Sequence, residues 1–207
     1  MGRPSLATER RRQILEAAIR CIAAHGLAAT TLDGIAEEAG MARGHVRHYA
    51  GNRDAVLTDA AVLLYFGEVP EAGAEDPVAA HGGTFLPEDT ATIEAALDYL
   101  FGDFAEPGPE NTVALAFVDA ARTNPSIHAI VVDAYLSSQS ELAAILATTH
   151  PECEPDARAD AAYGILTLAI GNVFMADLEV SAQRTASARR SAERLIAALP
   201  TSPTNDH

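Results

Sequence analysis

Residues 31–49 constrain the fold of this chain most strongly, because their pattern predicts two short helices joined by a tight turn. The Thr31 hydroxyl can cap the first helix by accepting a backbone hydrogen bond, and an apolar stripe at helical spacing follows it. Gly40 then permits the left-handed backbone conformation that ends a helix. The second helix has an expected inner face made of Ala42, Val46 and Tyr49. Two helices joined by a Gly-containing turn predict a helix-turn-helix.

The outer face of the second predicted helix carries residue types that contact DNA. Arg43, Gly44, His45, Arg47 and His48 lie on or beside the face away from the apolar stripe, given about 100° of rotation per residue. Arginine can donate two hydrogen bonds to guanine or one to a phosphate, and a glycine allows close approach to the sugar-phosphate backbone. We therefore expect this helix to bind in a major groove. The alternative is an ordinary helical hairpin with a solvated polar face.

Residues 10–57, about a quarter of the chain, resemble the DNA-binding domain of the tetracycline-repressor (TetR) family. The resemblance rests on the runs RRQILEAA (11–18), AHGL (24–27), TTLDGIA (30–36) and GHVRHYAGNRDAVL (44–57). It implies an all-α fold, in which an N-terminal three-helix helix-turn-helix domain precedes a C-terminal helical domain for ligand binding and dimerisation. It also implies a transcriptional regulator without catalytic activity, most often a repressor that a small molecule releases from a palindromic operator.

The resemblance extends to the residues expected to contact DNA. They are Thr31, Ala42, Arg43, Gly44, His45, Arg47, His48 and Arg53, with Arg3 in an N-terminal arm that reaches a minor groove or is simply unstructured. Three positions depart from the family pattern. Arg47 replaces a Tyr that often contacts phosphate, Ala50 replaces a Phe that locks the recognition helix to the core, and Arg53 replaces a phosphate-binding Lys. The operator sequence therefore cannot be carried over.

Charge is distributed unevenly along the chain, which has a formal net charge of −15 and no Lys. Residues 1–53 carry eight Arg against five acidic residues, a net charge of +3, and the remainder carries a net charge of −18. A basic head can approach phosphates while an acidic body restrains non-specific binding. The alternative for the body is an acidic surface that serves solubility alone.

Helical spacing and turn residues predict the domain organisation. A domain at 1–53 holds an arm and the helix-turn-helix, a helical effector and dimerisation domain covers 54–200, and residues 201–207 form a disordered tail. A helix from Asn52 to Phe66 should connect the two domains, followed by a mobile loop at 67–87 that is rich in Gly and Pro. The next helix should carry Ile93, Leu97, Leu100, Phe101 and Phe104 on one face.

The segment from about Asp156 to Leu178 is apolar nearly all round, so a helix there must be covered on both sides. The resemblance implies that the last two helices form a four-helix bundle with a second subunit, and the alternative is a central core helix in a monomer. The expected interface consists of Ile165, Leu166, Ile170, Val173, Leu195, Ile196 and Leu199. A helix-turn-helix gains affinity from two half-sites, which favours the homodimer.

The body helices also carry inward aromatic and polar groups that are candidates for an effector pocket. They are Tyr99, Phe104, Phe117, His128, Tyr135, Tyr163 and Phe174, each of which has ordinary core packing as its alternative. Their mixture favours a mostly apolar ligand with a few polar anchors. One rival hypothesis is a constitutive DNA-binding regulator without a small-molecule effector.

The other rival hypothesis is a helical enzyme, but the sequence contains no recognisable set of catalytic residues. His45 and His48 have a metal-compatible spacing, but no thiol or carboxylate completes a zinc set, so we expect no metal and no cofactor. Cys21 and Cys153 are isolated, which favours a reduced chain. The polar, Arg-rich N-terminus has no cleavable apolar segment, and the apolar run from Ile165 to Ala176 is short for a bilayer. We therefore expect a cytoplasmic protein.

Overall fold

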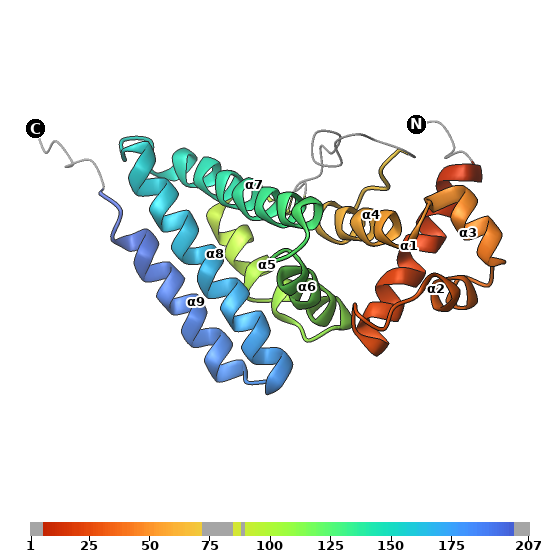
Figure 1. Ribbon diagram of the computed structural model, residues 1–207. Coiled ribbons are helices and arrows are strands. Elements are labelled where there is room, and N and C mark those ends of the chain that lie inside the picture. Colours follow the sequence, from red (N-terminus) through yellow and green to blue (C-terminus); the bar gives the residue numbers. More distant parts are fainter. Residues whose placement is uncertain (1–5, 72–84, 88–89, 201–207) are drawn as a thin grey trace, which may run out of the picture. The chain divides into compact units, whose positions relative to one another are not determined.

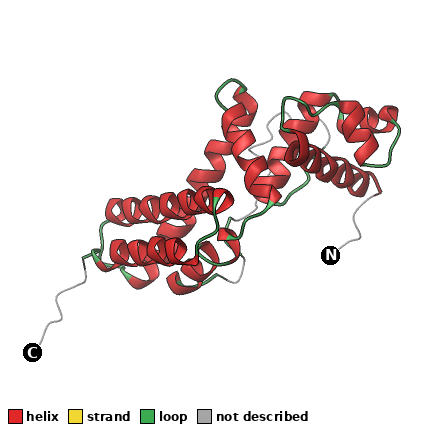
Figure 2. Ribbon diagram, turned by 90° about the horizontal axis from the view of Figure 1, so that it is seen from below, coloured by secondary structure: helices red, strands yellow, loops and turns green. Residues whose placement is uncertain are grey.

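The computed structural model describes residues 6–71, 85–87 and 90–200, and within these ranges every regular element is a helix (Figures 1 and 2). The predicted all-α fold is therefore confirmed. The elements are α1 (Leu6–His25), α2 (Leu32–Glu38), α3 (Arg43–Ala50), α4 (Arg53–Phe66), α5 (Ile93–Leu100), the 3-10 helix η1 (Asp103–Ala105), α6 (Pro109–Ala120), α7 (Pro125–Thr149), α8 (Pro155–Leu178) and α9 (Ala182–Ala197). Arg3, residues 72–84 of the predicted loop and the predicted tail at 201–207 lie outside the described residues.

The chain divides into two compact units. Unit 1 comprises Met1–Gly83 and Pro109–Ala134, and unit 2 comprises Thr84–Gly108 and Tyr135–His207. Helices α4 and α6 and the beginning of α7 therefore belong with α1–α3 in unit 1. The functional boundary expected after residue 53 remains a prediction, because compact packing does not by itself define where one function ends.

Unit 1 is organised around α1, which packs against α2, α3, α4 and α6. Ile14, Leu15 and Ile22 of α1 are fully buried, as expected for an apolar stripe at helical spacing. The helix ends at Gly26, whose φ of +79° is a conformation that glycine adopts without strain. Tyr65 on α4 donates a hydrogen bond to the carbonyl of Ala114 on α6, at 3.3 Å. These contacts give the helix-turn-helix a broad base of packed helices.

Unit 2 is built on α8, which packs along α9 and against η1. Its core joins Leu97 and Leu100 of α5, Leu142 and Leu146 of α7, and Ile165 of α8. Gly164 allows the close approach of α8 and α9, because a Cβ there would come within 2.7 Å of Leu195 Cδ1. A larger residue at position 164 would thus require the Leu195 side chain to move.

The helix expected to carry Phe101 and Phe104 is interrupted, which corrects the sequence-based prediction. Helix α5 ends at Leu100, and Phe104 lies in η1. Gly102 makes the break possible, since a Cβ at this position would come within 2.4 Å of the Asp98 carbonyl oxygen. Both aromatic residues still pack on the unit 2 core, because the break redirects the backbone without removing their apolar contacts.

Helices α7 and α8 are long and apolar enough, by length and composition alone, to cross a membrane. The prediction that the apolar run of α8 is too short for a bilayer considered only part of this helix, which spans 24 residues. Ala161, Ile165 and Ala169 of α8 are instead buried in the core of unit 2. Long apolar helices of this kind are expected at the centre of a soluble helical domain.

Candidate nucleic-acid interface

Helices α2 and α3 form the helix-turn-helix that the sequence predicts. Thr31 Oγ1 accepts a hydrogen bond from Gly34 N at 3.1 Å and caps α2. Gly40 adopts a φ of +64°, and Met41 N donates to the carbonyl of Ala36 at 2.9 Å, which closes the turn. The apolar stripe of α2 is buried, as predicted: Leu32, Ile35, Ala36 and Ala39. The local backbone chemistry therefore produces the turn that sets α3 across α2.

Helix α3 packs on unit 1 through Val46 and Ala50, the residues of this helix that are buried. Ala42 was expected on the inner face, but it is exposed, because it precedes the first turn of α3 as the N-cap residue. Tyr49 is half-buried, and its ring lies edge-on to that of His48, with 5.0 Å between the ring centroids. The alanine that replaces the usual Phe at position 50 is thus enclosed by its neighbours.

The opposite face of α3 is open to solvent. Arg43, Gly44, His45, Arg47 and His48 are all exposed, as expected for a DNA-contacting surface. Within the described part of the chain, Arg47 makes no ion pair, so its guanidinium is available to a phosphate or a base edge. A Cβ at Gly44 would meet no atom within 4 Å, so open space lies beside the helix there.

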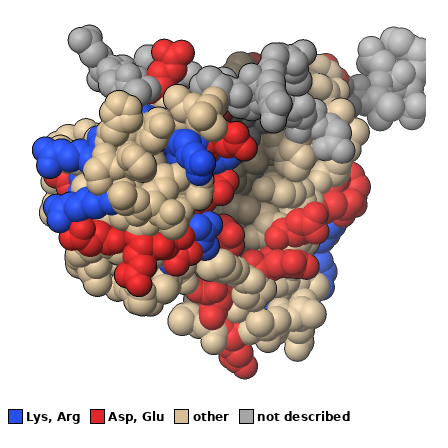
Figure 3. Space-filling model, turned by 90° about the vertical axis from the view of Figure 1, so that its right-hand side faces the viewer, with Lys and Arg blue, Asp and Glu red and all other residues tan. Residues whose placement is uncertain are grey.

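Arg43 differs from Arg47 because it already has a partner. Its Nη1 lies 2.9 Å from Asp33 Oδ2 of α2. Both side chains are largely exposed, so water and salt screen this ion pair. Figure 3 views the molecule from the side on which α1–α3 lie in Figure 1, and blue arginines and red acidic side chains occur close together on this face. Basic and acidic side chains are therefore interspersed on this face, which is not uniformly basic.

Arg53 has a role within the fold that the sequence did not suggest. Its Nε donates to the carbonyl of Thr30 at 2.6 Å, and its Nη2 donates to the carbonyl of Leu27 at 2.7 Å. The side chain thereby ties the start of α4 to the turn between α1 and α2. The adjacent Asn52 caps α4 by accepting from Ala55 N at 2.9 Å. The contact of Arg53 with phosphate remains a prediction alongside these bonds.

Arg11 and Asp59 form a buried ion pair that sequence reasoning missed. Arg11 Nη2 lies 2.5 Å from Asp59 Oδ2, and the two residues are only 7% and 8% exposed. Burial raises the pKa of the Asp59 carboxyl to about 6, although the Arg11 charge acts in the opposite direction. A signal was present in the sequence, because Arg11 is in helical register with the buried Leu15, Ala18 and Ile22.

A cavity of about 440 Å³ in unit 2 brings together three of the seven candidate ligand residues. Tyr135 of α7 lies across from Tyr163 and Phe174 of α8. The remaining lining residues, which sequence reasoning did not name as ligand contacts, are mostly apolar: Leu136, Gln139, Leu166, Thr167, Ile170 and Gly171. They were hidden because the sequence does not reveal which faces of α7 and α8 meet. The composition suits an apolar ligand with hydrogen-bonding groups.

The other four candidate ligand residues lie elsewhere. Tyr99 and Phe104 pack with Phe85 in an aromatic cluster, with ring centroids 5.1–6.3 Å apart. Burial raises the pKa of the Tyr99 hydroxyl, with a further contribution from Asp103. Phe117 is fully buried in unit 1, and His128 is exposed. The structure thus gathers Tyr135, Tyr163 and Phe174 into one site and separates these four from it.

The residues expected at a dimer interface differ in accessibility. Ile165, Leu166, Val173 and Leu199 are buried within the single chain, while Ile170 and Ile196 are half-buried and Leu195 is exposed. Other large apolar side chains of α8 are more accessible, with Tyr163 63% and Leu178 80% exposed. The outward apolar surface of α8 therefore consists mainly of residues that sequence reasoning had not assigned to the interface.

Neither a metal cluster nor a disulfide is present in the described part of the chain. No group of three or more His, Cys, Asp or Glu side chains that could hold a metal ion occurs among those residues. Cys21 and Cys153 are buried free thiols, and burial is the main cause that raises the pKa of Cys21.

Comparisons with known proteins agree with this geometry. Residues 14–60 match the model of the tetR family of bacterial regulatory proteins. A TetR transcription regulator from Haloarcula marismortui has a TM-score of 0.70 and 18% sequence identity, and the alignment covers 93% of this chain and 98% of that chain. A proposed transcriptional regulator from Saccharomonospora viridis, solved in complex with choline, has a TM-score of 0.66 and 20% sequence identity. That alignment covers 93% of this chain and 98% of the other.

The SmeT–triclosan complex has a TM-score of 0.64 and 19% identity, with 94% of this chain and 93% of that chain covered. No protein of curated function matches the sequence. At these identities the solved structures establish the fold of the chain, and the family match covers α2, α3 and most of α1 and α4.

Proposed function

The chain is a DNA-binding transcriptional regulator of the TetR family, and from this premise we propose that it is a dimeric repressor that a small molecule releases from a palindromic operator. The observation that carries the proposal is the exposed face of α3, where Arg43, His45, Arg47 and His48 surround Gly44. Arg47 is the proposed base-reading residue, because its guanidinium is exposed and makes no ion pair in the described structure. Flanking contacts with the sugar-phosphate backbone of DNA are assigned to Thr31, Ala42 and Arg53, together with Arg3 of the N-terminal arm.

We propose that the dimer forms through α8 and α9. Both helices belong to the proposed effector and dimerisation domain at residues 54–200. The exposed Met175 and Leu178 of α8 and Leu195 of α9 support this proposal, because large apolar side chains that face water are a common feature of protein–protein interfaces. A second copy that covers them removes that surface from solvent. Two copies also place two recognition helices on one face of DNA, about 34–36 Å apart.

The effector site is proposed to be the cavity between α7 and α8 of unit 2. Tyr135, Tyr163 and Phe174 provide aromatic surface there, and Gln139 and Thr167 provide polar groups. A mostly apolar, aromatic molecule with one or two hydrogen-bonding groups fits this lining. Choline and triclosan are bound in two proteins of the same fold, which makes small organic molecules a reasonable class to test.

The first experiment selects duplexes from a random pool with the full-length protein and measures affinity by fluorescence anisotropy. We expect the selected sequence to be an inverted repeat. Arg47→Ala should weaken binding to it by roughly 1–3 kcal/mol, with little effect on a random duplex. Arg122→Ala is the matched control, because Arg122 is exposed but lies outside α2 and α3. Equal losses on both duplexes would assign Arg47 to phosphate contact instead.

The second experiment separates an induced repressor from a constitutive regulator. Triclosan and other aromatic compounds are screened by thermal shift, and each binder is titrated with and without the selected duplex. An inducer must bind less tightly when DNA is present, by the same factor by which it weakens DNA binding. Identical affinities, or no binder at all, would favour a constitutive regulator. The match to a family of DNA-binding regulators argues against the enzyme hypothesis. We propose that the protein acts in the cytoplasm.

A further inference from the structure

Arg11 lies on the inner face of α1, and its guanidinium reaches two other helices of unit 1. Nη1 donates to the carbonyl of Tyr49 in α3, at 3.0 Å. Nη2 forms the 2.5 Å ion pair with Asp59 of α4 and also lies 3.5 Å from the carbonyl of Glu71. One buried side chain therefore joins the end of the recognition helix to the helix that follows it.

The contact with Tyr49 lies in the last turn of α3, a short helix that also packs against α1 and α2. The helix has only eight residues, and Val46 and Ala50 are its buried side chains. The carbonyl groups in the last turn of a helix lack partners within the helix, and a cation beside them is favourable. Arg11 supplies both a donor and a positive charge there. The small Ala50 side chain offers little apolar surface to hold α3 in place. The hydrogen bond from Arg11 to the Tyr49 carbonyl therefore contributes more to fixing the orientation of α3.

Asp59 determines where the Arg11 guanidinium lies. In the described structure Arg11 Nε has no hydrogen-bond partner, so the two Nη groups alone orient the planar fork. The Asp59 carboxylate holds one of them by a charge-assisted bond in a buried setting, and the other then points at Tyr49. Asp59 thus acts on α3 through Arg11.

We propose that Arg11 is a positioning residue for DNA recognition, which sets the orientation of α3 by joining the Tyr49 carbonyl to Asp59. The inference rests on the DNA-binding role of α3. Base contacts require α3 to meet the base edges at a fixed angle, whereas phosphate contacts of flexible arginines tolerate small rotations. Loss of the bridge therefore lowers affinity for a specific duplex while non-specific affinity changes little.

Arg11→Lys tests this directly. Lysine keeps the charge for Asp59, but its single ammonium lacks the fork that reaches two acceptors in fixed directions. We expect roughly tenfold weaker binding to the duplex selected by the wild-type protein, and a change of less than about twofold on a random duplex of equal length. Arg12→Lys is the matched control. Arg12 is the exposed neighbour on α1, and it donates to the carbonyl of Gly67. Among the described residues it makes no hydrogen bond or ion pair with α3.

Asp59→Asn is the second variant, because it keeps the shape of the side chain and removes the charge. We expect a smaller loss on the selected duplex than for Arg11→Lys, again without a matching loss on random DNA. This variant decides the matter if thermal melting shows that Arg11→Lys does not fold. Equal losses on both duplexes, or no loss on either, would overturn the positioning role. Failure of the wild-type protein to select any duplex would instead overturn the DNA-binding role on which the inference rests.

Discussion

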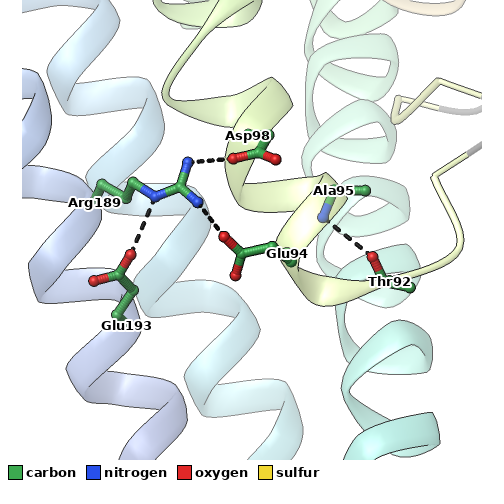
Figure 4. A network of polar contacts seen from close by, with 6 residues as sticks. All are labelled: Thr92, Glu94, Ala95, Asp98, Arg189 and Glu193. Carbon is green, nitrogen blue, oxygen red and sulfur yellow. Dashed lines mark hydrogen bonds and ion pairs between the residues drawn. The ribbon is translucent and has the colours of Figure 1, made fainter.

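Each unit of the molecule has an arginine that joins separate helices, but the two arginines lie in opposite surroundings. In unit 1, Arg11 is buried and has one carboxylate partner, Asp59. In unit 2, Arg189 of α9 contacts three carboxylates: Glu94 and Asp98 of α5 at 2.6 Å each, and Glu193 of α9 at 3.1 Å (Figure 4). The three acidic side chains are well exposed to solvent.

The difference shows that the number of partners does not decide what an ion pair contributes. Water and salt weaken the Arg189 network, which joins α9 to α5. Burial lowers the pKa of Arg189, but its bonds to Asp98 and Glu193 and the charge of Glu94 outweigh this effect and raise the pKa above its ordinary value. The Arg11 pair has fewer partners, yet removing one partner leaves the other charge in a medium that solvates it poorly. Burial therefore predicts a larger effect in unit 1 than in unit 2.

The largest effect should follow Arg11→Met. The substitution leaves the buried Asp59 carboxylate without its cation, so we expect the free energy of unfolding at pH 7 to fall by about 3 kcal/mol. The loss should be smaller at pH 5, because the carboxyl of the variant can take up a proton. Urea unfolding at the two pH values measures both changes. A loss below about 1 kcal/mol at pH 7 would erase the contrast between the units.

A pH series should reveal the titration of Asp59. Its folded-state pKa of about 6 lies above the ordinary value of 3.8, so the folded state binds the proton more tightly than the unfolded state. The resulting stabilisation is fully present below about pH 4 and is lost as the pH rises to about 6. Relative to Asp59→Asn, wild-type stability should fall by on the order of 2 kcal/mol over this interval.

The Asp59→Asn variant serves as the reference in this series because the other titrating groups are common to both proteins. Contributions of those groups therefore cancel from the difference between the two proteins. Urea unfolding at intervals between pH 4 and pH 7 gives the curve. A difference that stays flat or rises with pH would contradict the burial of this carboxyl.

A smaller effect is expected for Arg189→Met. The partners are exposed and screened, so the free energy of unfolding should fall by about 1 kcal/mol or less at low salt, and by less still in concentrated NaCl. The neighbouring Arg190→Met is the control, because Arg190 is exposed on the same helix. Urea unfolding at two salt concentrations is the measurement. A salt-independent loss as large as that of Arg11→Met would mean that burial is not the controlling variable.

The smallest effect on stability is expected for Asp33→Asn, which breaks an exposed pair within unit 1. The free energy of unfolding should stay within about 0.5 kcal/mol of wild type. Binding to a random duplex should strengthen by up to about fivefold, because the change frees Arg43 and removes one negative charge beside the proposed DNA-binding helix. Anisotropy titrations give the affinity. If Asp33→Asn lowered the free energy of unfolding by more than Arg189→Met does, ion pairs would matter more in unit 1 even when they are exposed. Burial would then not explain the difference between the two units.

The features that were predicted correctly from the sequence depend on residues close together in the chain. Thr31 caps α2 by accepting a hydrogen bond from the backbone amide of Gly34, three residues along the chain. Gly40 adopts the left-handed conformation expected after a helix. These outcomes follow from local backbone chemistry, in which a cap or a turn is decided by its immediate neighbours. The all-α fold and the exposed arginine-bearing face of α3 follow from the same short-range patterns.

The features that the sequence could not reveal are contacts between distant helices, because these depend on which helix faces meet. Arg11 and Asp59 are 48 positions apart, and the carbonyls that Arg53 binds are 23 and 26 positions away. The seven aromatic and polar candidates for the effector site had equal standing in the sequence, yet only Tyr135, Tyr163 and Phe174 line one cavity. Helical periodicity states which side of a helix is apolar but not which partner covers it. The tertiary structure decides that, because burial and the strength of a charge pair depend on atoms brought together from distant segments.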